Sequence, residues 1–159
     1  MKVCGIDPGT NGAICVLDDT DPAYIALLDL GKTSIYEATH WLHNEGLALN
    51  SSNIWIEDVH SLFGMSAKSN FGFGRNLGIV IAIAEIVTKG AITNTVTPKI
   101  WQKYIGVTAK GKAIKKQVAE IATSLYPTAT IHGKRGGLLD GRSDALMIAH
   151  YGLNHKETL

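Results

Sequence analysis

The sequence has 159 residues, of which 45% are hydrophobic, and a formal net charge of +1. This length and composition are typical of one globular domain and argue against intrinsic disorder. No apolar run approaches the ~18 residues of a membrane span, and no apolar signal region opens the chain. We therefore expect a single domain over residues 1–159 that is cytoplasmic and has no contact with a membrane.

The charges are unevenly distributed along the chain. Residues 1–60 hold nine acidic residues and only Lys2 and Lys32 as bases, whereas residues 97–135 hold eight bases and only Glu120 as an acid. Such asymmetry favours a surface that binds a polyanion beside an acidic site. The alternative is a solvated helix face, because lysines are common on exposed helices.

The first 30 residues have the pattern of a three-stranded antiparallel meander. Apolar runs alternate with turn residues, of which Pro8-Gly9 is the clearest pair. Cys4 and Cys15 fall within the first two runs, and we expect both to be free, buried thiols. The three expected strands cover residues 1–7, 12–17 and 23–30.

The rest of the chain alternates between helical and strand patterns, which predicts parallel strands. Ser34 is the expected cap of a helix over residues 34–49. A second helix is expected over residues 72–89, although its β-branched residues leave a strand as the competing interpretation. Further strands are expected at 53–58 and 91–96, further helices from Thr97 and at 112–125 and 139–153, and loops at 61–70 and 132–137.

The long helix over residues 72–89 carries no polar or charged side chain between Leu77 and Ala84. A helix that is apolar on all sides is buried on more than one side. We expect the sheet to cover one side and a second copy of the chain to cover the other. The expected dimer-interface residues are Leu77, Val80, Ile81 and Ala84.

Four acidic residues stand at the ends of expected elements. Asp7 ends the first strand and Glu57 the fourth, while Asp140 and Asp144 share one face of the last helix. Oxygen donors from three elements suit Mg²⁺ or Mn²⁺, and two such ions can promote phosphodiester hydrolysis. Each acid also has a simpler interpretation, in turn formation, in the helix dipole or in solvation at a strand end.

Several segments, taken in order, resemble the motifs of RuvC-type Holliday-junction resolvases, and more narrowly those of phages and their hosts. The resemblance covers nearly the whole chain and implies an RNase H-like α/β fold. This fold has a five-stranded mixed sheet, with a three-strand antiparallel meander and two parallel strands, flanked by helices. The acidic motifs are Ile6-Asp7-Pro8-Gly9, Ile56-Glu57-Asp58-Val59 and the run from Asp140 to Ala149, and the supporting segments are residues 71–78 and 96–101.

The resemblance implies a homodimer that nicks two strands of four-way and other branched DNA junctions symmetrically. It also implies the cytoplasm of a bacterial cell or of a phage-infected host. Two Mg²⁺ ions per active site, or Mn²⁺, would be held by Asp7, Glu57, Asp140 and Asp144. Bacterial members usually space the last two acids by three residues, and here the spacing is four, so the match is firmer at Asp144 than at Asp140.

Basic and aromatic residues near the acids are candidates for DNA contacts, because phosphates attract Lys and Arg and exposed bases stack on aromatic rings. In the bacterial enzymes an aromatic residue close behind the motif glutamate probes opened bases. His60 stands at that position here, and Phe63 follows, although Phe63 and Phe71 are equally suited to pack under the loop. The candidates are His60, Phe63, Phe71, Arg75, Lys110, Lys112, Lys115, Lys116, Lys134, Arg135 and Arg142.

Two similarities to nucleotide sites are rejected. Residues 106–113 nearly match a P-loop, but they end in Ala113 where Ser or Thr binds Mg²⁺. Residues 6–10 also resemble the first phosphate loop of sugar kinases and actin-like ATPases, which need a second domain. We expect no nucleotide cofactor. Two alternatives to a resolvase stay open, namely a catalytically silent junction-binding module and a related nuclease that acts on flaps or RNA–DNA hybrids.

Overall fold

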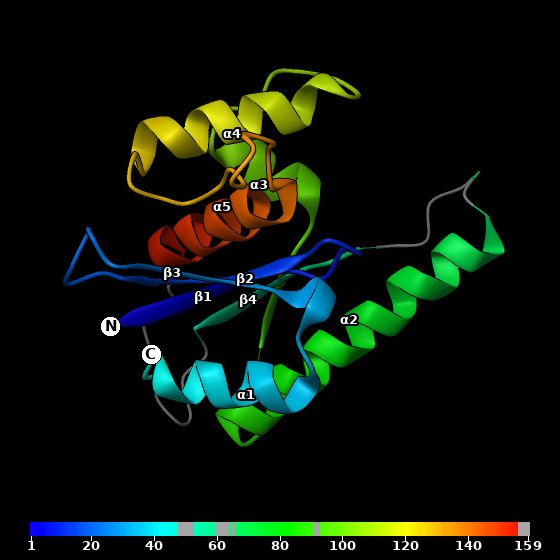
Figure 1. Ribbon diagram of the computed structural model, residues 1–159, viewed down its shortest axis with the longest axis vertical. Helices are drawn as coiled ribbons and strands as arrows, with labels where there is room; N and C mark the ends of the chain where they lie inside the picture. Colours follow the sequence, from blue (N-terminus) through cyan, green and yellow to red (C-terminus); the bar gives the residue numbers. More distant parts are fainter. Residues whose placement is uncertain (48–52, 60–63, 65, 91–92, 156–159) are drawn as a thin grey trace.

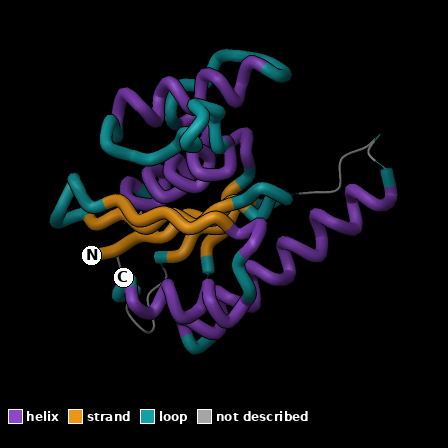
Figure 2. The backbone as a smooth tube through the Cα atoms, viewed as in Figure 1, coloured by secondary structure: helices purple, strands orange, loops and turns teal. Residues whose placement is uncertain are grey.

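The structure is a computed structural model that describes residues 1–47, 53–59, 64, 66–90 and 93–155. In this part of the chain a five-stranded sheet lies between two layers of helices (Figures 1 and 2). The strands are β1 (Lys2–Asp7), β2 (Ala13–Asp18), β3 (Ile25–Asp29), β4 (Ile54–Glu57) and β5 (Asn94–Val96). The helices are the short 3₁₀ turn η1 (Leu30–Lys32), α1 (Ile35–Asn44), α2 (Ala67–Thr88), α3 (Pro98–Tyr104), α4 (Ala113–Leu125) and α5 (Asp140–Asn154).

The strand order is β3-β2-β1-β4-β5, with antiparallel pairing among the first three strands of the chain. β4 pairs in parallel with both β1 and β5. This arrangement confirms the expected RNase H-like sheet. In the β1–β4 register Ile6 lies opposite Ile56, so the residues that follow, Asp7 and Glu57, reach the same edge of the sheet.

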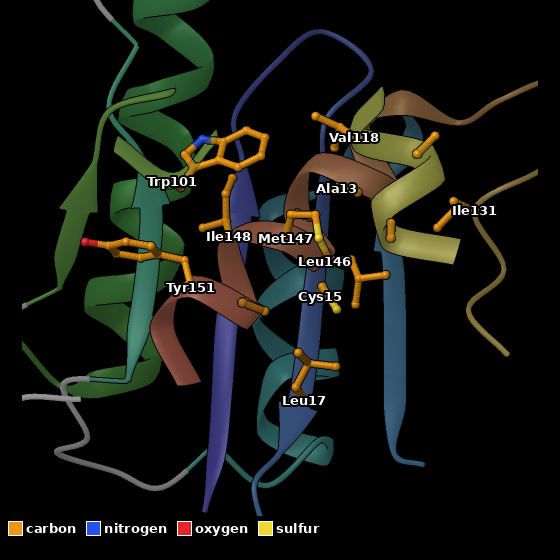
Figure 3. Close-up of a cluster of buried hydrophobic side chains, with 14 of the residues drawn as sticks. Ala13, Cys15, Leu17, Trp101, Val118, Ile131, Leu146, Met147, Ile148 and Tyr151 are labelled. Carbon is orange, nitrogen blue, oxygen red and sulfur yellow. The ribbon is translucent and has the colours of Figure 1, made fainter. Parts of the chain in front are cut away.

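Each face of the sheet builds its own hydrophobic core, because side chains along a strand alternate between the two faces. Ile6 and Ile14 point toward the layer of α1 and α2. Cys15 and Leu17 point toward the other layer, in which α5 lies directly on the sheet (Figures 1 and 3). Cys4 and Cys15 are buried and free, as expected.

Helix α5 approaches the sheet so closely that glycine is required at the contact. A Cβ atom on Gly5 of β1 would lie 2.2 Å from the backbone nitrogen of Ala149 and 2.4 Å from the carbonyl oxygen of Ala145. A Cβ atom on Gly141 would lie 2.0 Å from the carbonyl oxygen of Asn11. Backbone atoms cannot yield as a flexible side chain can. These two glycines therefore set α5, with its acidic first turn, against the ends of β1 and β2.

The boundaries of two helices differ from the expectation. Ser34 caps α1 as expected, within a capping box that also involves Glu37, but the helix ends at Asn44 instead of residue 49. Helix α2 begins at Ala67, inside the predicted loop 61–70, because the Ser66 hydroxyl accepts a hydrogen bond from the N–H of Ser69 and caps it. The sequence predicted a loop here because small polar residues, which are common in loops, occupy the start of the helix.

The structure corrects part of the predicted dimer interface on α2. Val80 is 2% exposed and Ala84 is fully buried, and both pack in the core that α2 forms with α1 and the sheet. Neither side chain is therefore available to a second copy. Leu77 and Ile81 are partly buried against the same core. The large apolar side chains that α2 exposes are Phe71 and Ile86.

Helix α2 extends well beyond the sheet at its N-terminal end (Figure 1). By length and composition alone, it is the one helix in the described ranges that could cross a membrane. Core helices of soluble proteins pass the same criterion, and α2 packs on α1 and β4. Its apolar composition is thus partly explained by the chain's own core.

Candidate active site

The four acidic residues singled out from the sequence line one cavity of about 580 Å³. Asp7 comes from the end of β1 and Glu57 from the end of β4. Asp140 and Asp144 come from the first turns of α5, which lies over these strand ends. Three elements far apart in the sequence therefore bring four carboxylates to the same place.

Asp7 both forms the turn and lines the cavity. Its side chain is 9% exposed, and its Oδ1 atom accepts a hydrogen bond of 2.8 Å from the N–H of Gly9. Burial raises the pKa of Asp7, and the charge of Asp140 adds to this, while the Gly9 N–H opposes it. The two interpretations that the sequence left open are therefore compatible.

Glu57 is held by a buried side-chain hydrogen bond. It is 8% exposed, and its Oε1 atom accepts a hydrogen bond of 2.9 Å from the indole N–H of Trp101. Burial and the nearby charge of Asp7 raise the pKa of Glu57 to about 7, and the indole N–H opposes the shift. At neutral pH this carboxyl is therefore only partly ionised unless a cation joins it.

The two acids of α5 differ in their surroundings. Burial raises the pKa of Asp144 well above its ordinary value, and the charges of Asp7, Glu57 and Asp140 add to the shift. Asp140 forms an ion pair with Lys115 of α4, which raises the pKa of the lysine. In the described part of the chain, Lys115 of α4 thus brings a positive charge to the wall of this acidic cavity.

The donor set of the cavity fits a hard divalent cation, since all four candidate ligands are carboxylates. Burial, with the charges of the neighbouring acids added, raises the pKa values of Asp7, Glu57 and Asp144, and a bound cation would oppose both effects. Among the described residues, however, no three acidic, His or Cys side chains converge closely enough to hold one ion as they stand. Side-chain rotation would be needed to close a metal site, and Asp140 would have to leave Lys115.

Of the predicted DNA-binding lysines and arginines, Lys115 lines the cavity and the others lie outside its lining. Lys110 and Lys112 lie in and beside the loop before α4, of which Gly111 is a lining residue. The side-chain oxygen of Gln117 holds this loop by accepting hydrogen bonds from the N–H groups of Thr108 and Ala109. Lys110, Lys112, Lys116, Lys134, Arg135 and Arg75 are all exposed.

Arg142 has a structural partner that the sequence did not reveal. Its guanidinium donates to both carboxylate oxygens of Asp29, at 2.6 and 2.8 Å, and to the carbonyl oxygen of Thr130 at 2.9 Å. These contacts join the end of β3 to α5 and to the loop before it. The predicted role of Arg142 in holding DNA remains a prediction.

Among the described residues, the aromatic side chain on the cavity wall is Phe73 of α2, which was not among the residues predicted from the sequence. Phe71 is 75% exposed, so the alternative in which it packs under the loop is wrong. His60 and Phe63 lie outside the described residues. Phe73 belongs to neither hydrophobic core. Its distance along the sequence from Glu57 does not indicate that α2 brings it back to the cavity.

Among the solved structures that match, two RuvC structures cover nearly the whole chain. RuvC of Thermus thermophilus in complex with a Holliday junction substrate covers 97% of this chain and 95% of its own, with a TM-score of 0.60 and 17% identity. A second Thermus thermophilus RuvC structure covers 97% and 96%, with a TM-score of 0.61 and 19% identity. The chain has the RuvC-type fold.

No protein-family model and no curated protein matches the sequence. The match to RuvC is therefore one of fold, and it confirms the architecture that the motifs implied. In this RuvC-type fold the four acids come together at the edge where β1 and β4 end. The chemistry of the site has to be argued from the chain's own residues.

Proposed function

We propose that this chain is a divalent-metal-dependent endonuclease that cuts four-way and other branched DNA junctions with paired nicks. The observation that carries the proposal is the convergence of Asp7, Glu57, Asp140 and Asp144 on one cavity within a RuvC-type fold. One of the matching structures is a RuvC bound to a Holliday junction substrate, which supports branched DNA as the substrate class. The motifs alone support the narrower placement among phage-like members.

The four carboxylates would hold Mg²⁺, or Mn²⁺ in its place, as one or two ions. Bound there, the metal would lower the pKa of a water molecule and stabilise the leaving oxygen of a phosphodiester. Asp7 and Glu57 are buried and each has one oxygen held by an N–H group, so these bonds restrict how far the two carboxylates move when the side chains close on an ion. Such preorganisation reduces the cost of forming the site.

Lys115 has two tasks in this proposal. Without a cation it offsets the charge of Asp140 and lowers the pKa of Asp7 and Asp144. If Asp140 served as a metal ligand, the exposed Lys115 ammonium would be available to bind a DNA phosphate at the mouth of the cavity. The loop lysines Lys110 and Lys112 lie on the same side and would extend this contact along the strand.

Paired nicks require two active sites, and hence a homodimer. Helix α2 supports this assembly because it projects beyond the sheet and exposes Phe71 and Ile86 (Figure 1). With Val80 and Ala84 occupied in the core, we place the contact on the exposed side of α2 around Ile86. Phe73, on the same helix, would face DNA in the cavity.

Synthetic four-way junctions incubated with Mg²⁺ test the proposal. We expect symmetric nicks that Asp7→Asn abolishes, while the exposed Asp21→Asn serves as a matched control and cuts as the wild type does. Tight junction binding without cleavage in Mg²⁺ or Mn²⁺ would instead identify a silent binding module. Equal cutting of linear duplex, or preferred cutting of flaps or RNA–DNA hybrids, would contradict junction selectivity.

A further inference from the structure

Trp101 is the only described residue of α3 that is buried, and its indole is fully enclosed. It belongs to the same buried cluster as Ile148 and Met147 of α5, on one face of the sheet (Figure 3). Its single polar atom, Nε1, donates to Oε1 of Glu57 at 2.9 Å. A buried indole N–H needs an acceptor, and here the acceptor is one of the four acids of the cavity.

The backbone fixes this pair in register. Val96 of β5 lies opposite Glu57 of β4, and the N–H of Asp58 donates to the carbonyl oxygen of Val96 at 2.8 Å. Thr97 then occupies the N-cap position of α3 and Pro98 its first turn, so the helix begins two residues beyond Val96. Trp101 therefore returns to Glu57 on a rigid path of only five residues from Val96.

The indole can fix Glu57 but cannot replace it as a ligand. An indole N–H is a donor only and carries no lone pair for a metal ion. It occupies one oxygen of the carboxylate and leaves the other for the cavity. Without this donor, a buried carboxylate repelled by Asp7 would lose the contact that holds it in place.

We propose that Trp101 is a positioning residue whose indole N–H holds the Glu57 carboxylate in the orientation that binds a divalent cation. The inference rests on the proposed function, because it takes Glu57 as a ligand. It also parallels Asp7, whose Oδ1 is held by the N–H of Gly9. Partners of this kind typically change metal affinity by ~10–100-fold when they are removed.

The first test uses the wild-type chain and the three indole N–H signals of Trp41, Trp55 and Trp101 in ¹⁵N NMR spectra. The variants Trp41→Phe and Trp55→Phe assign the signals by elimination. We expect Mg²⁺ to shift the Trp101 signal and to leave the other two nearly unchanged. A Trp101 signal that does not respond, or an equal response of all three, would overturn the proposal.

The second test compares Trp101→Phe with Trp55→Phe by calorimetric titration with Mn²⁺ in the absence of DNA. Trp55 is partly buried against the same core and packs edge-on against Tyr151, so Trp55→Phe also removes indole packing but leaves the hydrogen bond to Glu57 intact. We expect ~10-fold weaker Mn²⁺ binding for Trp101→Phe and wild-type affinity for Trp55→Phe. Junction cleavage by Trp101→Phe should recover at high Mn²⁺, which a purely structural loss would not do.

Equal Mn²⁺ affinities of the wild type and Trp101→Phe would overturn the role of Trp101 and leave the nuclease proposal intact. A second combination of results would separate the role of Trp101 from the nuclease proposal. If the wild-type chain leaves junctions uncut, and Trp101→Phe still binds Mn²⁺ more weakly than the wild type, the positioning role stands and the nuclease assignment fails.

Discussion

The replacement of Glu57 by Gln should stabilise the metal-free protein at alkaline pH. The carboxyl is buried, and its pKa rises from 4.5 to about 7 because of burial and the charge of Asp7. Gln removes the charge and keeps a side-chain oxygen that can accept the Trp101 N–H. A site optimised for a cation should thus be a source of instability when the cation is absent.

The magnitude follows from the difference in pKa between the folded and unfolded chains. A raised pKa means that ionisation is disfavoured in the folded state, so stability is greatest below pH 4.5 and falls as pH rises through 7. At ~1.4 kcal/mol per pKa unit, the full loss above pH 7 is ~3 kcal/mol. For a chain of this size that corresponds to a midpoint shift of about 6 to 12 °C.

Thermal unfolding in EDTA at pH 4.5 and pH 8 measures this effect. We expect Glu57→Gln to melt above the wild type at pH 8 and close to it at pH 4.5, while Mg²⁺ raises the wild-type midpoint more than that of the variant. Glu120→Gln, on the exposed side of α4, is the matched control and should change little. A variant no more stable than the wild type at pH 8, or equally stabilised at both pH values, would refute the reasoning.

Three further predictions concern the frame of the site. Gly5→Ala should cost at least ~3 kcal/mol in urea denaturation, because its Cβ would meet the backbone of α5, whereas Gly72→Ala, with open space around it, should be neutral or mildly stabilising. Lys115→Ala should lower the stability of the metal-free protein at pH 8 by ~0.5 kcal/mol, and Lys116→Ala, paired with Glu120 on the surface, by less in the same thermal melts. Val80→Glu should prevent folding as judged by circular dichroism, while Ile86→Glu should fold normally and weaken self-association in sedimentation experiments. A folded Val80→Glu dimer would contradict the position of this residue in the core.

Residues whose role follows from local pattern were predictable from the sequence. Alternating apolar runs predicted the strands, and the alternation of strands with helices predicted parallel pairing without naming which strands are neighbours. The sequence placed Asp7 and Glu57 at strand ends, and the parallel pairing of β1 with β4 in the structure brings them to one edge. Asp140 and Asp144 shared a face through helical spacing alone. Periodicity therefore placed the acids at the ends of elements before any contact was known.

Contacts between distant residues were not predictable in this way. Trp101 and Glu57 are 44 residues apart, and Arg142 and Asp29 are 113 apart, so no spacing rule connects them. Apolar residues on α2 gave no indication of which of them face the sheet and which face solvent. The assignment of Val80 and Ala84 to a dimer interface failed for that reason, since a core and an interface select the same residue types.

The close contact between α5 and β1 has a consequence for how the site tolerates sequence change. Two of the four acids stand on strands and two on helix α5. Where α5 meets β1, a Cβ atom on Gly5 would meet backbone atoms of the helix and no side chain. The separation of the two halves is therefore a property of the main chain. Substitutions that alter side-chain volume elsewhere in the core can therefore accumulate without increasing the distance between the two pairs of acids, provided that Gly5 and Gly141 remain glycine.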